Sequence, residues 1–111
     1  MDNGLYAVEF RTNNDHGNGI ITIVDGSING GDSGYYYQGR IRQTGKELKL
    51  NLSVKQYVSG YVSAFGSVGQ FSLDLTGSAH EDGITAQFHG NIIGSPSQQI
   101  NITAKKIEPI I

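Results

Sequence analysis

The chain has no cysteine, no tryptophan and only two prolines. The absence of cysteine excludes disulfides and thiolate metal sites. The longest apolar runs are a few residues, far short of the ~20 needed to cross a bilayer, so we expect no membrane segment. The N-terminus lacks a basic segment followed by an apolar one, so no export signal is expected and the cytoplasm is the default location.

Charge is scarce as well. Eight lysines and arginines stand against ten aspartates and glutamates, which gives a net charge of −2. This balance provides no bulk attraction to phosphate or to acidic membranes, so any association has to rest on local patches. At 111 residues the chain has room for one domain, and we expect residues 1–111 to form a single one.

Apolar residues recur at every second position, with turn residues between the runs, and this predicts β-strands. The clearest run is 48–55, where leucines and a valine alternate with polar residues. Asp25-Gly26 predicts a hairpin turn, because both central positions of the favoured turn need positive φ. Other strands are expected at 6–10, 20–24, 35–42, 71–76, 84–92 and 100–104, with a loop at 13–19 and turns near 82–83 and at 94–97.

In an open sheet of seven or eight such strands, the apolar face would be exposed to water. Closing the sheet buries this face, so we expect an all-β, small antiparallel up-and-down barrel. The alternation breaks at residues 56–68, which are expected to form one or two short strands or at most one short helix. A barrel of about eight strands is just wide enough inside for side chains or one small ligand. Small inward residues either relieve crowding or open a cavity, and the dense packing of protein interiors favours crowding relief; they are Gly39, Ala86, Gly90 and Ala104.

Motifs that carry chemistry are weak in this chain. Gly31-Asp32-Ser33-Gly34 reads like a protease nucleophile segment, but that chemistry needs a longer chain and a placed histidine base, so a tight turn is the favoured interpretation. The three histidines, His16, His80 and His89, have no metal-ligand spacing and are interpreted as surface residues. We expect no catalytic residue, no metal site and no cofactor.

Basic residues cluster on two consecutive predicted strands; they are Arg40, Arg42, Lys46, Lys49 and Lys55. With outward Tyr36 as a stacking platform, this cluster invites comparison with an oligonucleotide-binding barrel. The negative net charge and the lack of a second clearly outward aromatic in that strand argue against it. Lysines on outer strand faces also block edge pairing, so a solvated face is the favoured interpretation and nucleic-acid binding is not expected.

Several segments, in order along the chain, resemble the GrlR family of negative regulators of type III secretion genes. They are NGLYAVEF at 3–10, GNGI at 17–20, INGGD at 28–32, YQG at 37–39 and AKKIEP at 104–109. The resemblance implies a lipocalin-like barrel with a short flanking helix, a central apolar cavity and a homodimer. It also implies binding of a transcriptional activator through an acidic Glu-Asp-Glu-Asp turn.

In this chain the turn that corresponds to the acidic one is QTGKE at 43–47, and only Glu47 supplies a carboxylate. The turn is close to neutral or faintly basic, so it lacks the charge that would attract the same kind of basic partner. The candidate partner-binding residues are Gln43, Lys46 and Glu47.

Three hypotheses follow for function. A non-enzymatic adaptor acting through protein contacts as a homodimer is favoured. An outward apolar patch around Tyr57, Val58, Tyr61 and Val62 would support it, and the alternative is that these residues plug the barrel. The second is a carrier or sensor of a small apolar ligand. Its expected cavity lining is Phe10, Tyr37, Leu50, Phe71, Phe88 and Ile102. An enzyme ranks last, because no acid–base pair or activated nucleophile can be assembled from the sequence.

Overall fold

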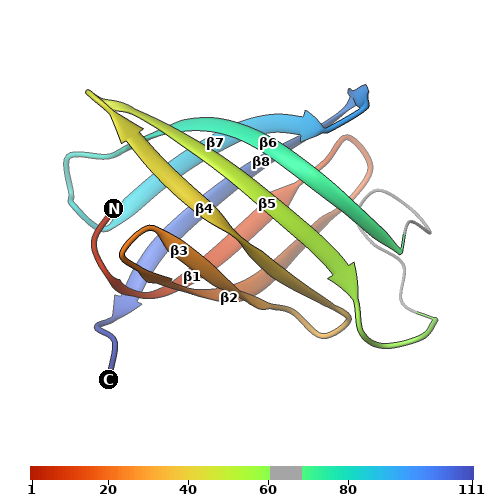
Figure 1. Cartoon of the computed structure of the whole chain (residues 1–111), viewed down its shortest axis with the longest axis horizontal. Coiled ribbons are helices and arrows are strands. Elements are labelled where there is room, and N and C mark those ends of the chain that lie inside the picture. Colours follow the sequence, from red (N-terminus) through yellow and green to blue (C-terminus); the bar gives the residue numbers. More distant parts are fainter. Residues whose placement is uncertain (61–68) are drawn as a thin grey trace.

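The computed structural model describes residues 1–60 and 69–111. Eight strands close into an antiparallel barrel in which each strand pairs with its neighbour along the chain and β8 pairs back with β1 (Figure 1). The strands are β1 Gly4–Arg11, β2 His16–Val24, β3 Ser27–Gly31, β4 Tyr35–Thr44, β5 Glu47–Gln56, β6 Gln70–Ala79, β7 Thr85–Ile92 and β8 Ser95–Glu108. The predicted all-β, up-and-down barrel is confirmed, with eight strands and no helix in the described part of the chain.

Closure depends on β1, which lies between β2 and β8. Phe10 of β1 is opposite Gly17 of β2 on one side and Ile102 of β8 on the other. The 14-residue β8 is the longest strand and ends at Glu108, immediately before Pro109. Closing the sheet removes the free edges that an open meander would expose, since no end strand is left unpaired.

The alternating pattern places the apolar side chains inside the barrel, as the sequence predicts. Along β5 the leucines and Val54 are buried while Lys49, Asn51 and Lys55 are exposed. The core is a single cluster to which every strand contributes; its largest fully buried members are Tyr6, Ile23, Ile28, Leu48 and Leu75. A register slip of one residue in β5 would exchange leucines for lysines in this core, so the pairing is strongly specified.

Two predicted turns are present. Asp25 and Gly26 connect β2 to β3 with φ values of +51° and +81°, as the two-residue hairpin turn requires. Gly45 and Lys46 connect β4 to β5, with Thr44 paired to Glu47. Both turns lie at the same end of the barrel as the chain's N-terminus (Figure 1).

Three boundary predictions are wrong. β2 begins at His16 within the loop expected at 13–19, because backbone pairing with β1 continues through the glycines without needing an apolar pattern. β8 begins at Ser95 inside the turn expected at 94–97, since Pro96 is tolerated at the start of a strand. Ile84, expected inside, precedes β7 and is 41% exposed. The Asp82 carboxylate accepts the backbone N–H groups of Ile84 and Thr85, which holds Ile84 in the loop.

Glycine lets neighbouring strands approach closely at two of the small inward positions. A Cβ on Gly39 would lie 1.9 Å from the carbonyl oxygen of Asn51, and one on Gly90 would lie 1.9 Å from that of Asp74. These glycines therefore relieve contact with a backbone rather than crowding among side chains in the core. The interior also contains a cavity, and Ala104 is the one of the four small inward residues found among its described lining residues.

The connection between β5 and β6 was the unresolved part of the sequence prediction. Tyr57 to Gly60 are described, and residues 61–68 lie outside the described residues, so the short helix or strands expected at 56–68 remain a prediction for most of that segment. Tyr61 and Val62 of the expected apolar patch also fall there. In the described ranges, no helix with the length and apolar character of a membrane span is found.

Candidate functional site: the barrel cavity

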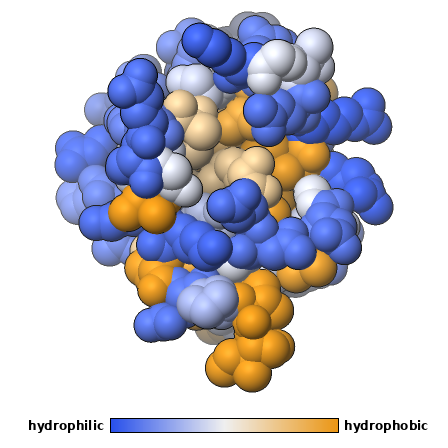
Figure 2. Space-filling model, turned by 90° about the vertical axis from the view of Figure 1, so that its left-hand side faces the viewer, coloured by the Kyte–Doolittle hydropathy of each residue, from blue (hydrophilic) through white to orange (hydrophobic). Residues whose placement is uncertain are grey.

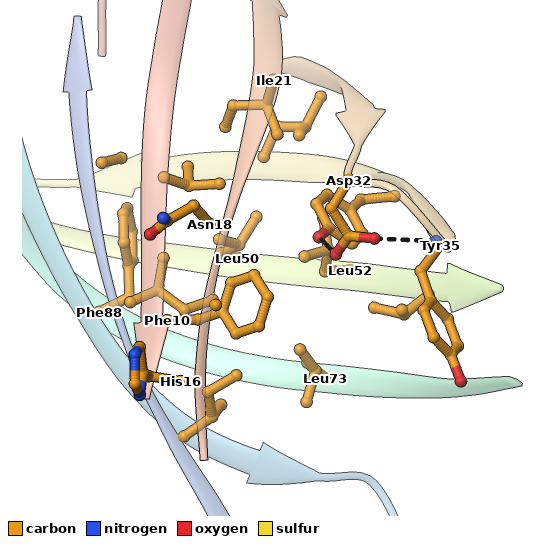
Figure 3. Close-up of a pocket in the computed structure, with 18 of the residues that line it drawn as sticks. Phe10, His16, Asn18, Ile21, Asp32, Tyr35, Leu50, Leu52, Leu73 and Phe88 are labelled. Carbon is orange, nitrogen blue, oxygen red and sulfur yellow. Dashed lines mark hydrogen bonds between the residues drawn. The ribbon is translucent and has the colours of Figure 1, made fainter. Parts of the chain in front are cut away.

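The barrel contains a partly open cavity of about 250 Å³ whose wall is mostly apolar (Figure 3). All eight strands contribute residues to its wall. The six residues expected to line a cavity all lie on this wall; they are Phe10, Tyr37, Leu50, Phe71, Phe88 and Ile102. Figure 2, which faces the end of the barrel that carries the N-terminus, shows apolar side chains at the centre within a ring of polar ones. The structure therefore brings these six side chains together, and their role in binding stays a prediction.

Glycines of β2 make room for two of the aromatic side chains of the cavity. A Cβ on Gly17 would lie 2.6 Å from the Cζ atom of Phe10, and one on Gly19 would lie 3.1 Å from the hydroxyl of Tyr37. The rings of Phe10 and Tyr37 therefore occupy space that side chains at these positions would fill. The GNG segment at 17–19 thus shapes the part of the cavity wall next to Phe10 and Tyr37.

Asp32 forms the polar end of the cavity. Its Oδ1 atom accepts the backbone N–H groups of Gly34 and Tyr35, each at 2.9 Å, and its Oδ2 atom accepts a hydrogen bond from the Tyr37 hydroxyl (Figure 3). The carboxylate therefore both stabilises the turn between β3 and β4 and holds a buried tyrosine. The predicted tight turn at residues 31–34, with Asp32 bonding its own backbone, is confirmed.

Burial is the main cause that raises the pKa of Tyr37 far above its ordinary value, and the hydrogen bond to Asp32 and the negative charge of that carboxylate raise it further. Tyr37 is therefore a neutral hydroxyl at physiological pH. Tyr57, which follows β5, also contacts this turn: its hydroxyl donates to the Asp32 carbonyl oxygen at 2.7 Å and its N–H donates to the Gly34 carbonyl oxygen at 3.0 Å. The turn at the polar end of the cavity is consequently held both by its own hydrogen bonds to the Asp32 carboxylate and by those from Tyr57.

The structure separates the three histidines. His16 begins β2 and borders the cavity, His80 lies in the loop after β6, and His89 is exposed on β7. Asp15 and Ser33 also border the cavity. Over residues 1–60 and 69–111, no group of three or more histidines and carboxylates is arranged to hold a metal ion.

The candidate partner-binding turn lies at the opposite end of the barrel from Asp32 (Figure 1). The Gln43 side chain donates to the Gly45 carbonyl oxygen at 3.0 Å, and Glu47 pairs with Lys49 at 3.7 Å. Lys46 and Glu47 border an open groove that continues over the outer face of β6, β7 and β8. The wall of that groove is rich in hydroxyl and amide groups; it includes Thr76, Ser78, Gln87, Asn101 and Thr103.

The basic residues lie on the outer face, as the alternation predicts. Arg42 and Lys49 are directly opposite one another on β4 and β5, and all five members of the cluster are exposed. Tyr36 faces outward opposite Lys55, and its ring centroid lies 6.4 Å from that of Tyr57. Tyr57, the described aromatic of the expected apolar patch, is exposed, whereas Val58 is half-buried.

Sequence reasoning missed the polar end of the cavity. The sequence indicated Asp32 only as a turn residue. The structure shows in addition that its carboxylate accepts a hydrogen bond from the hydroxyl of Tyr37, five residues later in β4. The available signal was an aspartate in a glycine-rich reversal followed by an inward-facing tyrosine, since a buried tyrosine hydroxyl usually finds a partner. Met1, Asn18 and Ser33 also border the cavity without having been predicted.

Comparison with known proteins identifies one family. No curated protein matched the chain. A family model described as "T3SS negative regulator, GrlR" matches residues 1–107, which is nearly the whole chain and agrees with the resemblance seen in its segments. The chain therefore belongs to the GrlR family of type III secretion system negative regulators.

Proposed function

We propose that this protein is a non-enzymatic regulator of type III secretion genes that acts by binding another protein as a homodimer. The family match over residues 1–107 is the observation that carries this proposal. The partner class is a transcriptional regulator protein in the cytoplasm, since control of gene expression by a protein without an evident nucleic-acid face requires an intermediary that has one.

The β4–β5 turn is the proposed contact with the partner. Glu47 is engaged by Lys49, whereas Lys46 at the tip and Arg42 beside it are exposed. Charge complementarity at an interface steers association and selects partners. The exposed cations at this end favour a partner whose contact face is acidic or neutral, in contrast to the basic face that an acidic turn would select.

The outer face of β1 to β4 supports the homodimer. Ile20 lies between Ala7 of β1 and Gly31 of β3, and Gly31 in turn lies opposite Tyr36 of β4. Ile20 is 44% exposed and Tyr36 is 39% exposed, so this outer row of four strands presents apolar surface to solvent. Apolar surface with aromatic residues and little charge is typical of the centre of a protein interface.

The test is native mass spectrometry on tagged protein purified gently from the bacterium that encodes it. The expected species is a dimer that retains a transcriptional regulator. The variant Lys46→Glu should release the regulator and keep the dimer, whereas Ile20→Asp should break the dimer. Lys55→Glu, which makes the same charge change at the far end of β5, is the control for Lys46→Glu. A monomer that retains no protein would contradict the proposal.

A carrier or sensor of a small apolar ligand is the second candidate. It is favoured by the cavity, although about 250 Å³ is slightly below the ~300 Å³ at which pockets for drug-sized ligands begin. The same spectra test it, because a homogeneous small molecule retained by the barrel would appear as a constant mass increment. A purified protein whose mass equals that of the polypeptide alone would count against this second role.

A further inference from the structure

We infer that the barrel cavity selects a small apolar molecule whose head group donates hydrogen bonds, an amine or an alcohol, and that it rejects carboxylates. The inference rests on the second role proposed above, that of a ligand carrier, and names the chemical class of its ligand. It is independent of the protein partner at the β4–β5 turn, which lies at the other end of the barrel.

The hydrogen-bonding capacity left at the polar end is the first argument. An ionised carboxylate accepts about four hydrogen bonds, and among the described residues Asp32 receives three, from Gly34, Tyr35 and Tyr37. Oδ2 therefore keeps capacity to accept another. The Tyr37 hydroxyl donates its proton to Asp32, so its oxygen can only accept from a ligand. The Asp32 carboxylate and the Tyr37 hydroxyl oxygen can therefore both accept a hydrogen bond from a ligand, and neither can donate one.

Charge is the second argument. Over the described residues, the cavity wall includes Asp15, Asp32 and His16 but no lysine or arginine. Met1, which carries the positively charged amino terminus, also borders the cavity, but it lies at the end of the barrel opposite Asp32 (Figure 1). A carboxylate head group placed next to Asp32 would meet a like charge in a partly apolar site, where water screens the repulsion less than in bulk. An ammonium group in the same position would be attracted.

Shape is the third argument. Phe10, Leu50, Leu52 and Leu73 supply apolar surface around the same cavity that Asp32 borders, as the close-up shows (Figure 3). A ligand that fits has an apolar body against these side chains and one head group at Asp32. The volume of about 250 Å³ restricts this body to a short chain or a small ring.

Four probes with nearly equal chain length separate these arguments: octylamine, 1-octanol, octanoate and heptyl methyl ether. Each is titrated into the full chain while the amide resonances of Gly34 and Tyr35 are followed by NMR. Octylamine and 1-octanol are expected to shift both amides and to bind at least about tenfold more tightly than octanoate, since a like charge near a carboxylate is strongly unfavourable. Heptyl methyl ether, which only accepts hydrogen bonds, should bind more weakly than 1-octanol.

The variant Asp32→Asn tests the residue itself. Asparagine keeps an oxygen that can accept from Gly34 and Tyr35, so the turn should form, and a thermal melt verifies this. The preference for octylamine over octanoate should fall at least about tenfold, because the carboxylate charge is gone. The control Asp25→Asn makes the same charge change at the β2–β3 turn and should leave the preference unchanged.

Octanoate that binds the unmodified protein as tightly as octylamine would overturn the inference, and so would an unchanged preference in folded Asp32→Asn. If all four probes bind equally, the cavity carries ligands without selecting the head group, so the inference fails and the carrier role survives. If none of them binds, both fail. The series on the unmodified protein decides the inference even if Asp32→Asn does not fold.

Discussion

Leu50 of β5 and Leu75 of β6 lie directly opposite one another in the barrel sheet, yet Leu50 borders the cavity and Leu75 is buried away from it. The exposed fraction of Leu75 is 1% and that of Leu50 is 5%, so burial alone does not distinguish them. The difference lies in what each side chain touches. Leu75 has protein atoms around it, whereas part of the surface of Leu50 faces empty space.

This pair predicts unequal costs for the same substitution. Leu75→Ala should reduce the free energy of unfolding by about 2–5 kcal/mol, because it removes packed contacts and leaves a new cavity. Leu50→Ala should cost less, since a side chain beside a void has fewer contacts to lose. Urea unfolding of both variants measures the two values. Equal costs would show that the cavity collapses around Leu50 in solution.

Gly90→Ala should destabilise the barrel by about 1–3 kcal/mol or more, as overpacked sites do. The added Cβ would lie 1.9 Å from the carbonyl oxygen of Asp74, and a backbone atom can move only if the strands separate. Gly69→Ala is the control, because among the described residues its Cβ would have its closest contact at 3.7 Å, with the Gln56 side chain. The measurement is again the urea unfolding free energy, and a neutral Gly90→Ala would contradict the close approach of β6 and β7.

Tyr37 should make stability fall in alkali. Its pKa is raised in the folded state, mainly by burial and then by Asp32, whereas in the unfolded chain it is about 10. The unfolded chain therefore loses this proton first, so the stability from neutral Tyr37 is complete below pH about 10 and declines above it. Unfolding free energies measured from neutral to alkaline pH should decline more steeply for the unmodified protein than for Tyr37→Phe.

At neutral pH, Tyr37→Phe should itself cost about 1.5–3 kcal/mol, the range for hydrogen bonds to charged groups. Tyr6, whose pKa is also raised by burial, is present in both proteins, so the difference between them isolates Tyr37. Parallel pH profiles for the two proteins would contradict this assignment.

Arg42 and Lys49 place two positive charges directly opposite one another on the outer face of β4 and β5. Like charges in this position are destabilising, and Glu47 and Thr76 offset part of the cost through contacts with Lys49 at 3.7 and 3.2 Å. Arg42→Thr should therefore raise stability by about 0.2–1 kcal/mol at low salt. The gain should shrink in high salt because exposed charges are screened, and a gain independent of salt would point to another cause.

Acid should loosen the loop between β6 and β7. The hydrogen bonds from the Ile84 N–H, the Thr85 hydroxyl and the Thr85 N–H lower the pKa of the Asp82 carboxyl. Stability from a carboxylate with a lowered pKa is present above its unfolded value and is lost as the pH falls through the folded value. Hydrogen exchange of the Ile84 and Thr85 amides should therefore lose protection in acid. In Asp82→Ala the same amides should be unprotected at every pH.

The barrel could be predicted because strand patterning is a local property. Leu48, Leu50, Leu52 and Val54 have to share one face, and several such strands can hide that face only by closing. Strand ends were harder to place, because backbone pairing extended β2 to His16 and β8 to Ser95 without an apolar signal. The position of Ile84 outside the strand depends on a hydrogen bond to the Asp82 carboxylate, which the alternation of apolar and polar residues cannot predict.

The sequence by itself determined which side chains point inward along most strands, including the six expected on the cavity wall, since a period of two assigns each strand residue to a face; Ile84 is the exception noted above. Only the tertiary structure decided that the space among them stays open and that Asp32 closes one end of it by accepting a hydrogen bond from Tyr37. The reason is geometric. Whether the space stays open depends on how eight strands cross and where glycines let backbones approach, and neither is a property of any single strand.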